Sequence, residues 1–311
     1  HEVTVGAVYI TDDGKTRIYI HLEEGRTSPM LGCCPNGTVT VDWGDETTPD
    51  TLTGTSTSAV KWTPTHNYAA PGDYVIKLTV SGTMEFYGRY SNKQRGGLLR
   101  HSSAEDNRNQ AYLNAVRKIE IGSGVTSIGI YAFSDCNLLS VVTIPDGVTS
   151  IKYSAFQDCY SLSGITIPSG VTSIENYMFQ KCYSLSDIAI PSGVTSIGNG
   201  VFYNCNSLSG ITIPSGVTSI GKAVFQSCYS LSDINIPNGV TSIGDTVFSG
   251  CSSLPRITIP DGVTSIGGDA FDTCYSLSRI TIPDGVTSIG KYAFNSCYGI
   301  KFYDFTAATA V

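Results

Sequence analysis

Apolar residues recur with a period of 23 positions over about the last three fifths of the chain. The pattern is clearest in residues 257–279, ITIPDGVTSIGGDAFDTCYSLSR. The unit occurs eight times without an insertion, beginning at Ile119, Val142, Ile165, Ile188, Ile211, Ile234, Ile257 and Ile280. A fixed period of this length predicts a solenoid, because each unit can bury its apolar side only against the next coil.

Within one unit the spacing of apolar residues changes twice. Alternation at 257–259 predicts a short strand that ends at Pro260, since proline cannot donate to a strand ladder. A second extended run follows at 263–266. After Gly267 the apolar residues fall three to four positions apart, which predicts a short helix: Ala270, Phe271, Cys274 and Leu277. Each coil is therefore expected to be strand, turn, strand and short helical turn.

The residues before the repeats show a different pattern. Residues 1–21 alternate around the turn 12–14 and predict a hairpin, followed by a polar loop at 23–37. Residues 104–118 keep the repeat frame in degenerate form and predict a helix that caps the first coil. The preceding segment, 87–103, is predicted to be a mobile loop because it is polar and contains Gly96-Gly97. At the other end, 303–305 predict a truncated ninth strand.

The repeat L-x-x-I-x-I-P-x-G-V-T-S-I-G-x-x-A-F-x-x-C-x-S closely resembles the BspA-type leucine-rich repeat of bacterial surface proteins. The resemblance implies a right-handed, curved leucine-rich repeat solenoid. It also implies a role in adhesion or surface recognition and an extracellular or cell-surface location, without indicating a particular ligand.

A second resemblance lies before the repeats. Trp43-Gly44-Asp45 and the pattern H-x-Y-x-x-P-G-x-Y-x-V/I-x-L-x-V at 66–80 resemble the PKD (polycystic kidney disease) domain over about 38–82. That family is an immunoglobulin-like β-sandwich, which occurs as a spacer or binding module in extracellular proteins. We therefore expect a mainly β chain with a PKD-like sandwich at 1–83, a linker and solenoid cap at 84–118, and the solenoid at 119–311.

Charge is distributed unevenly along the chain. The net charge of -7 divides into -1 for residues 1–118 and -6 for residues 119–311. An acidic solenoid argues against nucleic acid as a partner, because phosphate contacts need lysine and arginine. A basic cluster precedes the repeats: Arg89, Lys93, Arg95, Arg100, Arg108, Arg117 and Lys118. It either meets an anionic glycan or pairs with the acidic solenoid, and the second interpretation is favoured.

Eight of the ten cysteines occupy one position of the repeat: Cys136, Cys159, Cys182, Cys205, Cys228, Cys251, Cys274 and Cys297. Stacked about 4.8 Å apart and pointing the same way, they do not match disulfide geometry well, so we expect buried reduced thiols. Zinc is disfavoured because the repeats contain no histidine. Cys33 and Cys34 are expected in a loop, either paired with each other or exposed.

The sequence does not indicate a catalytic or metal-binding site. Asp42, Asp45, His66 and Asp73 can be imagined as a metal or acid–base set, but two of them lie in turn signatures, which favours a structural role. A solenoid repeats like groups along a line, whereas catalysis needs unlike groups that converge. We therefore expect no enzyme activity and no cofactor or metal.

Two outward columns are candidate ligand-binding surfaces. The residue after the cysteine is tyrosine in five coils: Tyr160, Tyr183, Tyr229, Tyr275 and Tyr298. Aromatic rings with hydroxyl groups suit recognition, although the favoured interpretation is that these rings shield the core and pack on each other. The rival surface is the outward strand position, flat, small and polar: Thr143, Thr166, Thr212, Thr258 and Thr281.

We therefore predict a non-enzymatic extracellular binding or adhesion module that recognises a host protein or glycan through the solenoid. A structural spacer or display stalk is one alternative, and a non-catalytic module of a carbohydrate-active or proteolytic surface system is another. The chain starts at His1 and has no apolar run near 18 residues. A signal peptide is accordingly expected to have been removed or to lie outside the chain, and membrane attachment only through an anchor outside it.

Overall fold

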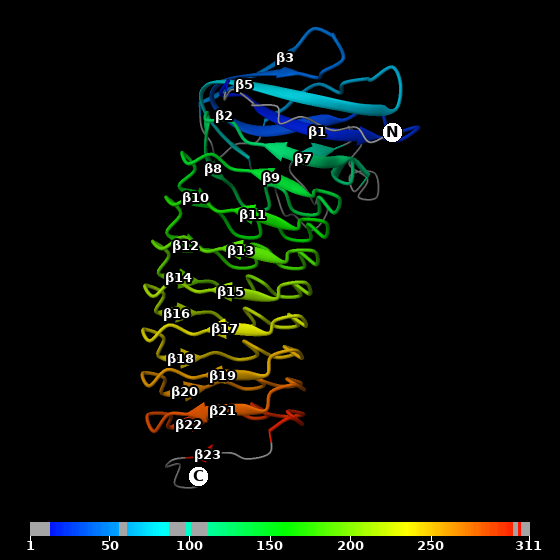
Figure 1. Cartoon of the computed structure of the whole chain (residues 1–311). Coiled ribbons are helices and arrows are strands. Elements are labelled where there is room, and N and C mark those ends of the chain that lie inside the picture. The colour runs from blue at the N-terminus through cyan, green and yellow to red at the C-terminus, as the bar shows by residue number, and fades with distance from the viewer. Residues whose placement is uncertain (1–12, 56–60, 87–97, 101–110, 301–303, 306–311) are drawn as a thin grey trace, which may run out of the picture.

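The computed structural model describes residues 13–55, 61–86, 98–100, 111–300 and 304–305 (Figure 1). Six strands of the described residues precede the repeats: β1 (Thr16–Leu22), β2 (Met30–Asp42), β3 (Asp50–Thr55), β4 (Lys61–Trp62), β5 (Gly72–Phe86) and β6 (Leu99–Arg100). Residues 111–113 are helical. Within the described residues, no helix is long and apolar enough to cross a membrane.

The repeats stack as a β-solenoid with two columns of short strands, as the apolar pattern predicted (Figure 1). The first column contains β7 (Val116–Glu120), β9 (Val141–Thr143), β11 (Gly164–Thr166), β13 (Asp187–Ala189), β15 (Gly210–Thr212), β17 (Asp233–Asn235), β19 (Arg256–Thr258), β21 (Arg279–Ile282) and β23 (Asp304–Phe305). The second contains β8 (Val125–Ile128), β10 (Ser150–Ile151), β12 (Ser173–Ile174), β14 (Ser196–Ile197), β16 (Ser219–Ile220), β18 (Ser242–Ile243), β20 (Ser265–Ile266) and β22 (Ser288–Ile289).

Where strands of successive coils are hydrogen-bonded, they pair in parallel at a register of one repeat. In the first column, Ile165 of β11 lies opposite Ile188 of β13, and in the second Ile197 of β14 lies opposite Ile220 of β16. β23 lies opposite β21 at the position expected for a ninth strand. The short first-column strands bury their central isoleucine and expose the residue after it, which is the expected alternation.

The prediction of a short helix in each coil is wrong. No residue between 119 and 300 is helical; the third segment is a series of turns with two residues in the left-handed region, such as Ala223 (φ 56°) and Ser227 (φ 60°). The N–H of Phe225 donates to the carbonyl oxygen of Val247 in the next coil, at 2.9 Å. Hydrogen bonding between coils therefore replaces hydrogen bonding within a helix. Apolar spacing of three to four residues also suits this arch, because it turns the same side chains inward.

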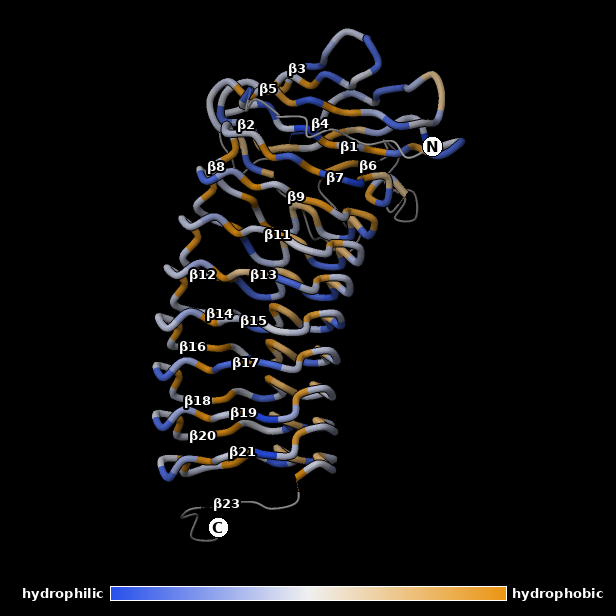
Figure 2. Tube along the Cα trace, in the orientation of Figure 1, coloured by the Kyte–Doolittle hydropathy of each residue, from blue (hydrophilic) through white to orange (hydrophobic). Residues whose placement is uncertain are grey.

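Phenylalanine rings form a continuous column through the solenoid core. From Phe156 to Phe294, neighbouring rings are stacked at 5.3–5.9 Å between centroids and 6–12° between planes. Figure 2 shows the apolar segments recurring coil after coil. Each added coil thus covers the apolar side of the one before it, which explains why the units occur as an array.

The eight repeat cysteines are buried, as predicted, and line the core beside the phenylalanines. In Cys228, Sγ donates to the carbonyl oxygen of Phe202, at 3.1 Å. The same contact recurs at the other repeat cysteines from Cys159 to Cys297, at 3.0–3.3 Å. Burial raises the pKa of the Cys228 thiol, so this thiol stays protonated and acts as a donor.

The loop expected at 23–37 is partly wrong, because Met30–Asp42 forms strand β2. Cys33 and Cys34 lie on this strand and are buried, not exposed in a loop. Cys33 pairs with Lys61 of β4 and Cys34 with Glu85 of β5. A strand with proline and glycine in it was not anticipated, since these residues usually mark turns.

The first strands form a sheet that continues into the solenoid. The predicted hairpin falls partly outside the described residues, which exclude 1–12. β1 pairs with β5 and, on its other side, with β7; β5 pairs with β2 and, at its end, with β8. The described strands from Thr16 to Phe86 thus form a sheet, and the predicted sandwich is not confirmed.

β1 and β5 cover the first coil. Each of these strands adds one further strand to a strand column of the solenoid. The ring centroid of Phe86, at the end of β5, lies 5.2 Å from that of Phe133, the first ring of the core column. β5 therefore runs across the boundary expected at residue 83. The prediction of a helix up to residue 118 is wrong in its last part, because 116–118 belong to β7; residues 101–110 lie outside the described chain.

The segment predicted to be a mobile loop lies mostly outside the described residues. Within it, Leu99 and Arg100 form β6 and pair with Leu31 and Met30 of β2. This pairing was not predicted, because it joins segments nearly 70 positions apart in the sequence and leaves no local mark on either.

Candidate functional site

The strand face, as we call it, is the outward surface of the first strand column from β9 to β21. Each strand contributes two outward positions, one on each side of its buried isoleucine or valine. The leading positions are Val141, Gly164, Asp187, Gly210, Asp233, Arg256 and Arg279. The trailing positions are Thr143, Thr166, Ala189, Thr212, Asn235, Thr258 and Thr281, and all seven are exposed. The structure thus brings the five rival threonines onto one surface.

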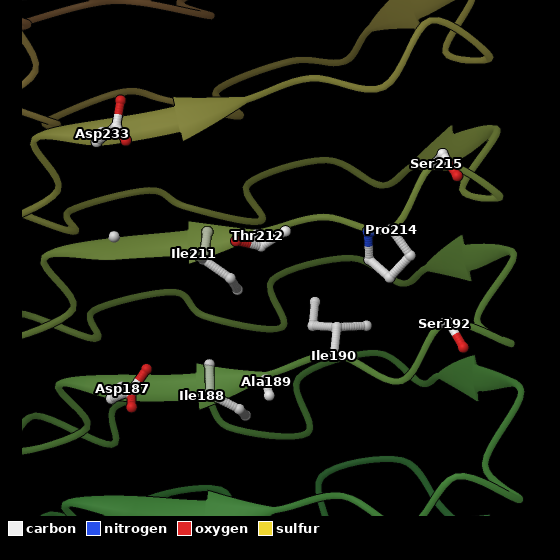
Figure 3. A pocket seen from close by; sticks show the side chains of 11 residues that line it. Asp187, Ile188, Ala189, Ile190, Ser192, Ile211, Thr212, Pro214, Ser215 and Asp233 are labelled. Atoms are coloured by element: carbon white, nitrogen blue, oxygen red, sulfur yellow. The ribbon is translucent and has the colours of Figure 1, made fainter.

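An open groove of about 730 Å³ lies on the strand face between the fourth and fifth coils (Figure 3). Its lining includes Asp187, Ala189, Ser192, Thr212, Ser215 and Asp233. Figure 3 shows the two aspartates at the starts of their strands and the two serines at the turns beyond the strand ends. The groove therefore crosses the full width of the strand column.

The groove lies over an interruption in the strand ladder. β13 ends one hydrogen-bonded sheet and β15 begins another, so these neighbouring strands are not paired. Gly210 lies between Asp187 and Asp233 and contributes no side chain to fill the space. The unpaired strand edges and the missing side chain together leave this stretch of the face open.

The tyrosine column consists of two stacked pairs and one separate ring. Tyr160 and Tyr183 are half-buried and stack at 4.8 Å between centroids, and Tyr275 and Tyr298 stack at 5.8 Å. Tyr229 lies alone between Asn206 and Ser252. The five tyrosines line one side of the solenoid, but four of them cover one another's ring faces.

The first tyrosine pair lies close to charged side chains of the solenoid. Burial raises the pKa of Tyr160, and the nearby Asp158 carboxylate adds to the rise. Asp158 in turn lies 3.3 Å from the ammonium of Lys181 in the next coil. These contacts support the expectation that tyrosines of this column have a packing role.

The four polar residues considered as a chemical set do not converge. Asp45 contacts His66 at 2.8 Å, whereas Asp73 contacts His21 instead, also at 2.8 Å. Burial favours a raised pKa for Asp45, but hydrogen bonds from Thr47 and His66 outweigh it and hold the pKa below its ordinary value. Within the described residues, no group of three or more histidine, cysteine, aspartate or glutamate side chains could hold a metal ion.

His66 has a structural environment. Its ring stacks on the buried Trp43 at 4.5 Å, and the Tyr68 hydroxyl donates to the carbonyl oxygen of Trp43 at 2.9 Å. Trp43 itself donates through Nε1 to Asp50, at 2.8 Å. The aromatic cluster and its carboxylates therefore hold the turn after β2.

Most of the basic cluster before the repeats lies outside the described residues. Of its described side chains, Arg117 donates to the carbonyl oxygen of Asn114, and Lys118 lies 2.7 Å from Glu120. Both contacts hold the start of the first coil. They fit pairing within the solenoid end more closely than a glycan site.

The charges on the strand face were missed from the sequence. Asp187, Asp233, Arg256 and Arg279 share the position just before the isoleucine that begins each repeat unit. Threonine recurs at five of the seven trailing positions, whereas the leading position beside it varies between coils. Comparing every outward position between coils would have found it.

Comparison with protein families gives a match over well over half of the chain. A family model described as the BspA type leucine rich repeat region, with six copies, matches residues 108–232 and 218–309. None of the curated proteins matches this chain. The comparisons show no PKD-like domain.

Several solved structures are similar over part of the chain. A leucine-rich repeat protein of T. pallidum is 29% identical, with a TM-score of 0.47, over 59% of this chain and 77% of that one. A leucine-rich cell surface protein from Faecalibacterium prausnitzii is 33% identical, with a TM-score of 0.46, over 62% of this chain and 61% of that one. The pneumococcal vaccine antigen PcpA is 19% identical, with a TM-score of 0.43, over 58% and 55%. By the family match, this chain belongs to the BspA type leucine-rich repeat family.

Proposed function

We propose that the protein is a non-catalytic binding or adhesion module of a bacterial cell surface, and that the strand face is its ligand-binding surface. The observation that carries the proposal is the row of exposed small side chains over seven coils, six of them polar, with an open groove in its middle. Exposed hydroxyl and carboxylate groups on a rigid sheet can bind a protein or glycan without losing the side-chain entropy of longer residues.

The strand face fits this role better than the tyrosine column. Four of the five tyrosines stack in pairs, so a ligand would have to compete with ring packing. Exposure along the column is uneven: Tyr160 and Tyr183 are half-buried, while Tyr298 is 79% exposed. In contrast, a substitution at Thr212 or Thr258 faces water and leaves the core untouched.

The test screens the protein against arrays of extracellular host proteins and glycans and then compares two variants. Thr212→Arg combined with Thr258→Arg should abolish binding to the ligand found while the melting temperature stays nearly unchanged. The matched control changes Tyr160, Tyr183 and Tyr229 together to Ser, which should leave binding intact. Loss of binding only in the tyrosine variant, at unchanged melting temperature, would move the site to the tyrosine column.

A display stalk without a ligand of its own is the competing function. It is favoured by the regular stack of near-identical coils in Figure 1. A ligand that the arrays identify, and that the Thr212 and Thr258 variant loses, would exclude the stalk as the whole function.

The finer assignments belong to the same proposal. Residues 1–83 are proposed as a PKD-like unit, 84–118 as the connection and cap, and 119–311 as the solenoid. The motif Trp43-Gly44-Asp45 and its packing on His66 support the first of these. An extracellular location, with attachment only through an anchor outside this chain, and a host protein or glycan as partner complete the proposal.

A further inference from the structure

The strand face carries its charges in separate halves. Asp187 and Asp233 lie over the groove, and Arg256 and Arg279 follow on the next strands of the same column. None of these four side chains forms an ion pair, with a nitrogen–oxygen distance of 4.0 Å or less, with another described residue. The four charges are therefore available to a ligand, acidic in the middle of the face and basic toward its C-terminal end.

The dimensions of the face suit a single extended chain. Six coil spacings separate Val141 from Arg279, or about 29 Å at about 4.8 Å per spacing, and a three-residue strand is about 10 Å wide. Covering this area buries about 300 Å² on the solenoid, well below the roughly 800 Å² per partner of a standard protein–protein interface. An extended segment of about nine residues, at about 3.4 Å each, has the matching length.

The charge spacing also matches an extended chain. The middle of the groove, at Gly210, lies two and a half coils from the midpoint between Arg256 and Arg279, or about 12 Å. In an extended segment, side chains four residues apart lie on the same side and about 13 Å apart. If a basic side chain of the ligand lies between Asp187 and Asp233, an acidic side chain four residues further along the ligand therefore lies between the two arginines.

From these observations we infer that the strand face binds an extended polypeptide segment with a basic and an acidic residue four positions apart. The inference rests on the proposed function and names its ligand. An anionic glycan would meet the two arginines but be repelled by the two aspartates, and a neutral glycan would hydrogen-bond to these side chains without using their opposite charges. A second copy of the chain would need a larger contact than this narrow face offers.

The probes are ten-residue serine/threonine peptides with one arginine and one glutamate, titrated into the whole protein and followed by nuclear magnetic resonance. The peptide with a spacing of four should bind about two- to twentyfold more tightly than one with adjacent charges, because its second charge adds two exposed ion pairs and each pair contributes a factor of about 1.5 to 5. An uncharged peptide of the same length gives the baseline. Raising the salt concentration should weaken the preference.

Variants test whether the four charges are responsible. Asp187→Asn with Asp233→Asn, or Arg256→Gln with Arg279→Gln, should each remove the preference for a spacing of four. Exchanging the charges, with lysine at both aspartates and glutamate at both arginines, should restore it, because the peptide then binds in the reverse direction. The matched control, Asp261→Asn with Asp284→Asn, removes two exposed carboxylates from the turns and should change nothing.

Equal binding of all spacings, or a preference that survives in the neutral variants, would overturn the inference. So would a wild-type dimer in sedimentation that the neutral variants lose, since the face would then pair with a second copy. If the peptides fail but the Thr212 and Thr258 variant still loses an array ligand, only the peptide inference falls and the proposed function stands.

Discussion

At the scale of single residues, the phenylalanine column sets the stability of the solenoid. Phe225 is fully buried and stacks between Phe202 and Phe248, at 5.6 Å from each. Replacing it with alanine should lower the free energy of unfolding by about 3 to 5 kcal/mol, because the coils on both sides cannot close the cavity. Chemical denaturation measures this loss.

The control for this prediction lies in the same coil. Tyr229→Ser removes a ring that is 50% exposed and should cost about 1 kcal/mol or less. A loss below about 1 kcal/mol for Phe225→Ala would show that the column does not carry the stability.

The buried thiols predict a loss of stability in alkali. Burial raises the pKa of six of the repeat thiols, Cys136, Cys159, Cys182, Cys205, Cys228 and Cys251. In the unfolded chain these thiols ionise near about pH 8.5. Their contribution is therefore complete below that pH and falls as the pH rises toward the folded pKa, by about 1.4 kcal/mol per pH unit for each thiol.

Denaturation midpoints between about pH 8 and 9.5 test this prediction, in a range where tyrosines stay protonated. Burial raises the pKa of Cys33 to about 12, and the neighbouring Cys34 adds to this rise. Burial also raises the pKa of Cys34 to about 12. Both thiols therefore add to the loss of stability with rising pH. A flat profile over this range, or neighbouring repeat cysteines linked as disulfides in mass spectrometry, would contradict the assignment of buried protonated thiols.

Residue roles in the repeats could be read from the sequence because the same position recurs eight times. Phe225 and Cys228 were placed inward in this way, and Thr212 outward. Cys33 and Cys34 have no such repetition, and their neighbours suggested a loop. Only the long-range pairing of β2 with β4 and β5 places them in the core.

At the scale of elements, the close approach of β1 to the first coil depends on Gly122. Its N–H donates to Thr16 Oγ1 at 2.9 Å, and a Cβ at this position would lie 2.6 Å from the carbonyl carbon of Lys15. Gly122→Ala should therefore push β1 away and cost about 1 to 3 kcal/mol in chemical denaturation. Gly147→Ala is the control, because a Cβ there meets nothing within 4 Å, and equal effects of the two variants would refute a tight joint.

The third segment of each coil shows why period alone does not define an element. Apolar residues three to four apart fit a helix, yet the left-handed residues Ala223 and Ser227 interrupt any helix in that coil. Neither residue type signals a positive φ strongly in a sequence. The groove was equally hidden, since it lies over the unpaired edge between β13 and β15, which no local pattern in the sequence marks.

At the scale of the whole molecule, the sheet that joins the first strands to the solenoid predicts unfolding as one body. Both tryptophans, Trp43 and Trp62, lie before the repeats, so their fluorescence reports on that part, while far-ultraviolet circular dichroism reports mainly on the solenoid. The two signals should give coincident denaturation midpoints, because β1 and β5 supply strands to both parts. Separate midpoints would show two independently folding units.

The architecture of the repeats was predictable, whereas their junction with the first strands was not. Stacking of identical coils follows from the period, but β1 reaches β7 across about 100 residues, and no local pattern records such pairing. The sequence suggested a linker and a helical cap at the place where β5 passes directly into contact with β8.

The central claim is that the strand face binds an extracellular ligand. The most direct measurement is binding of the whole protein and of its Thr212→Arg, Thr258→Arg variant to arrays of host extracellular proteins and glycans, with melting temperatures measured in parallel. The account predicts at least one ligand that the wild type binds and the equally stable variant does not. A ligand bound equally by both proteins, or no ligand at all, would contradict it.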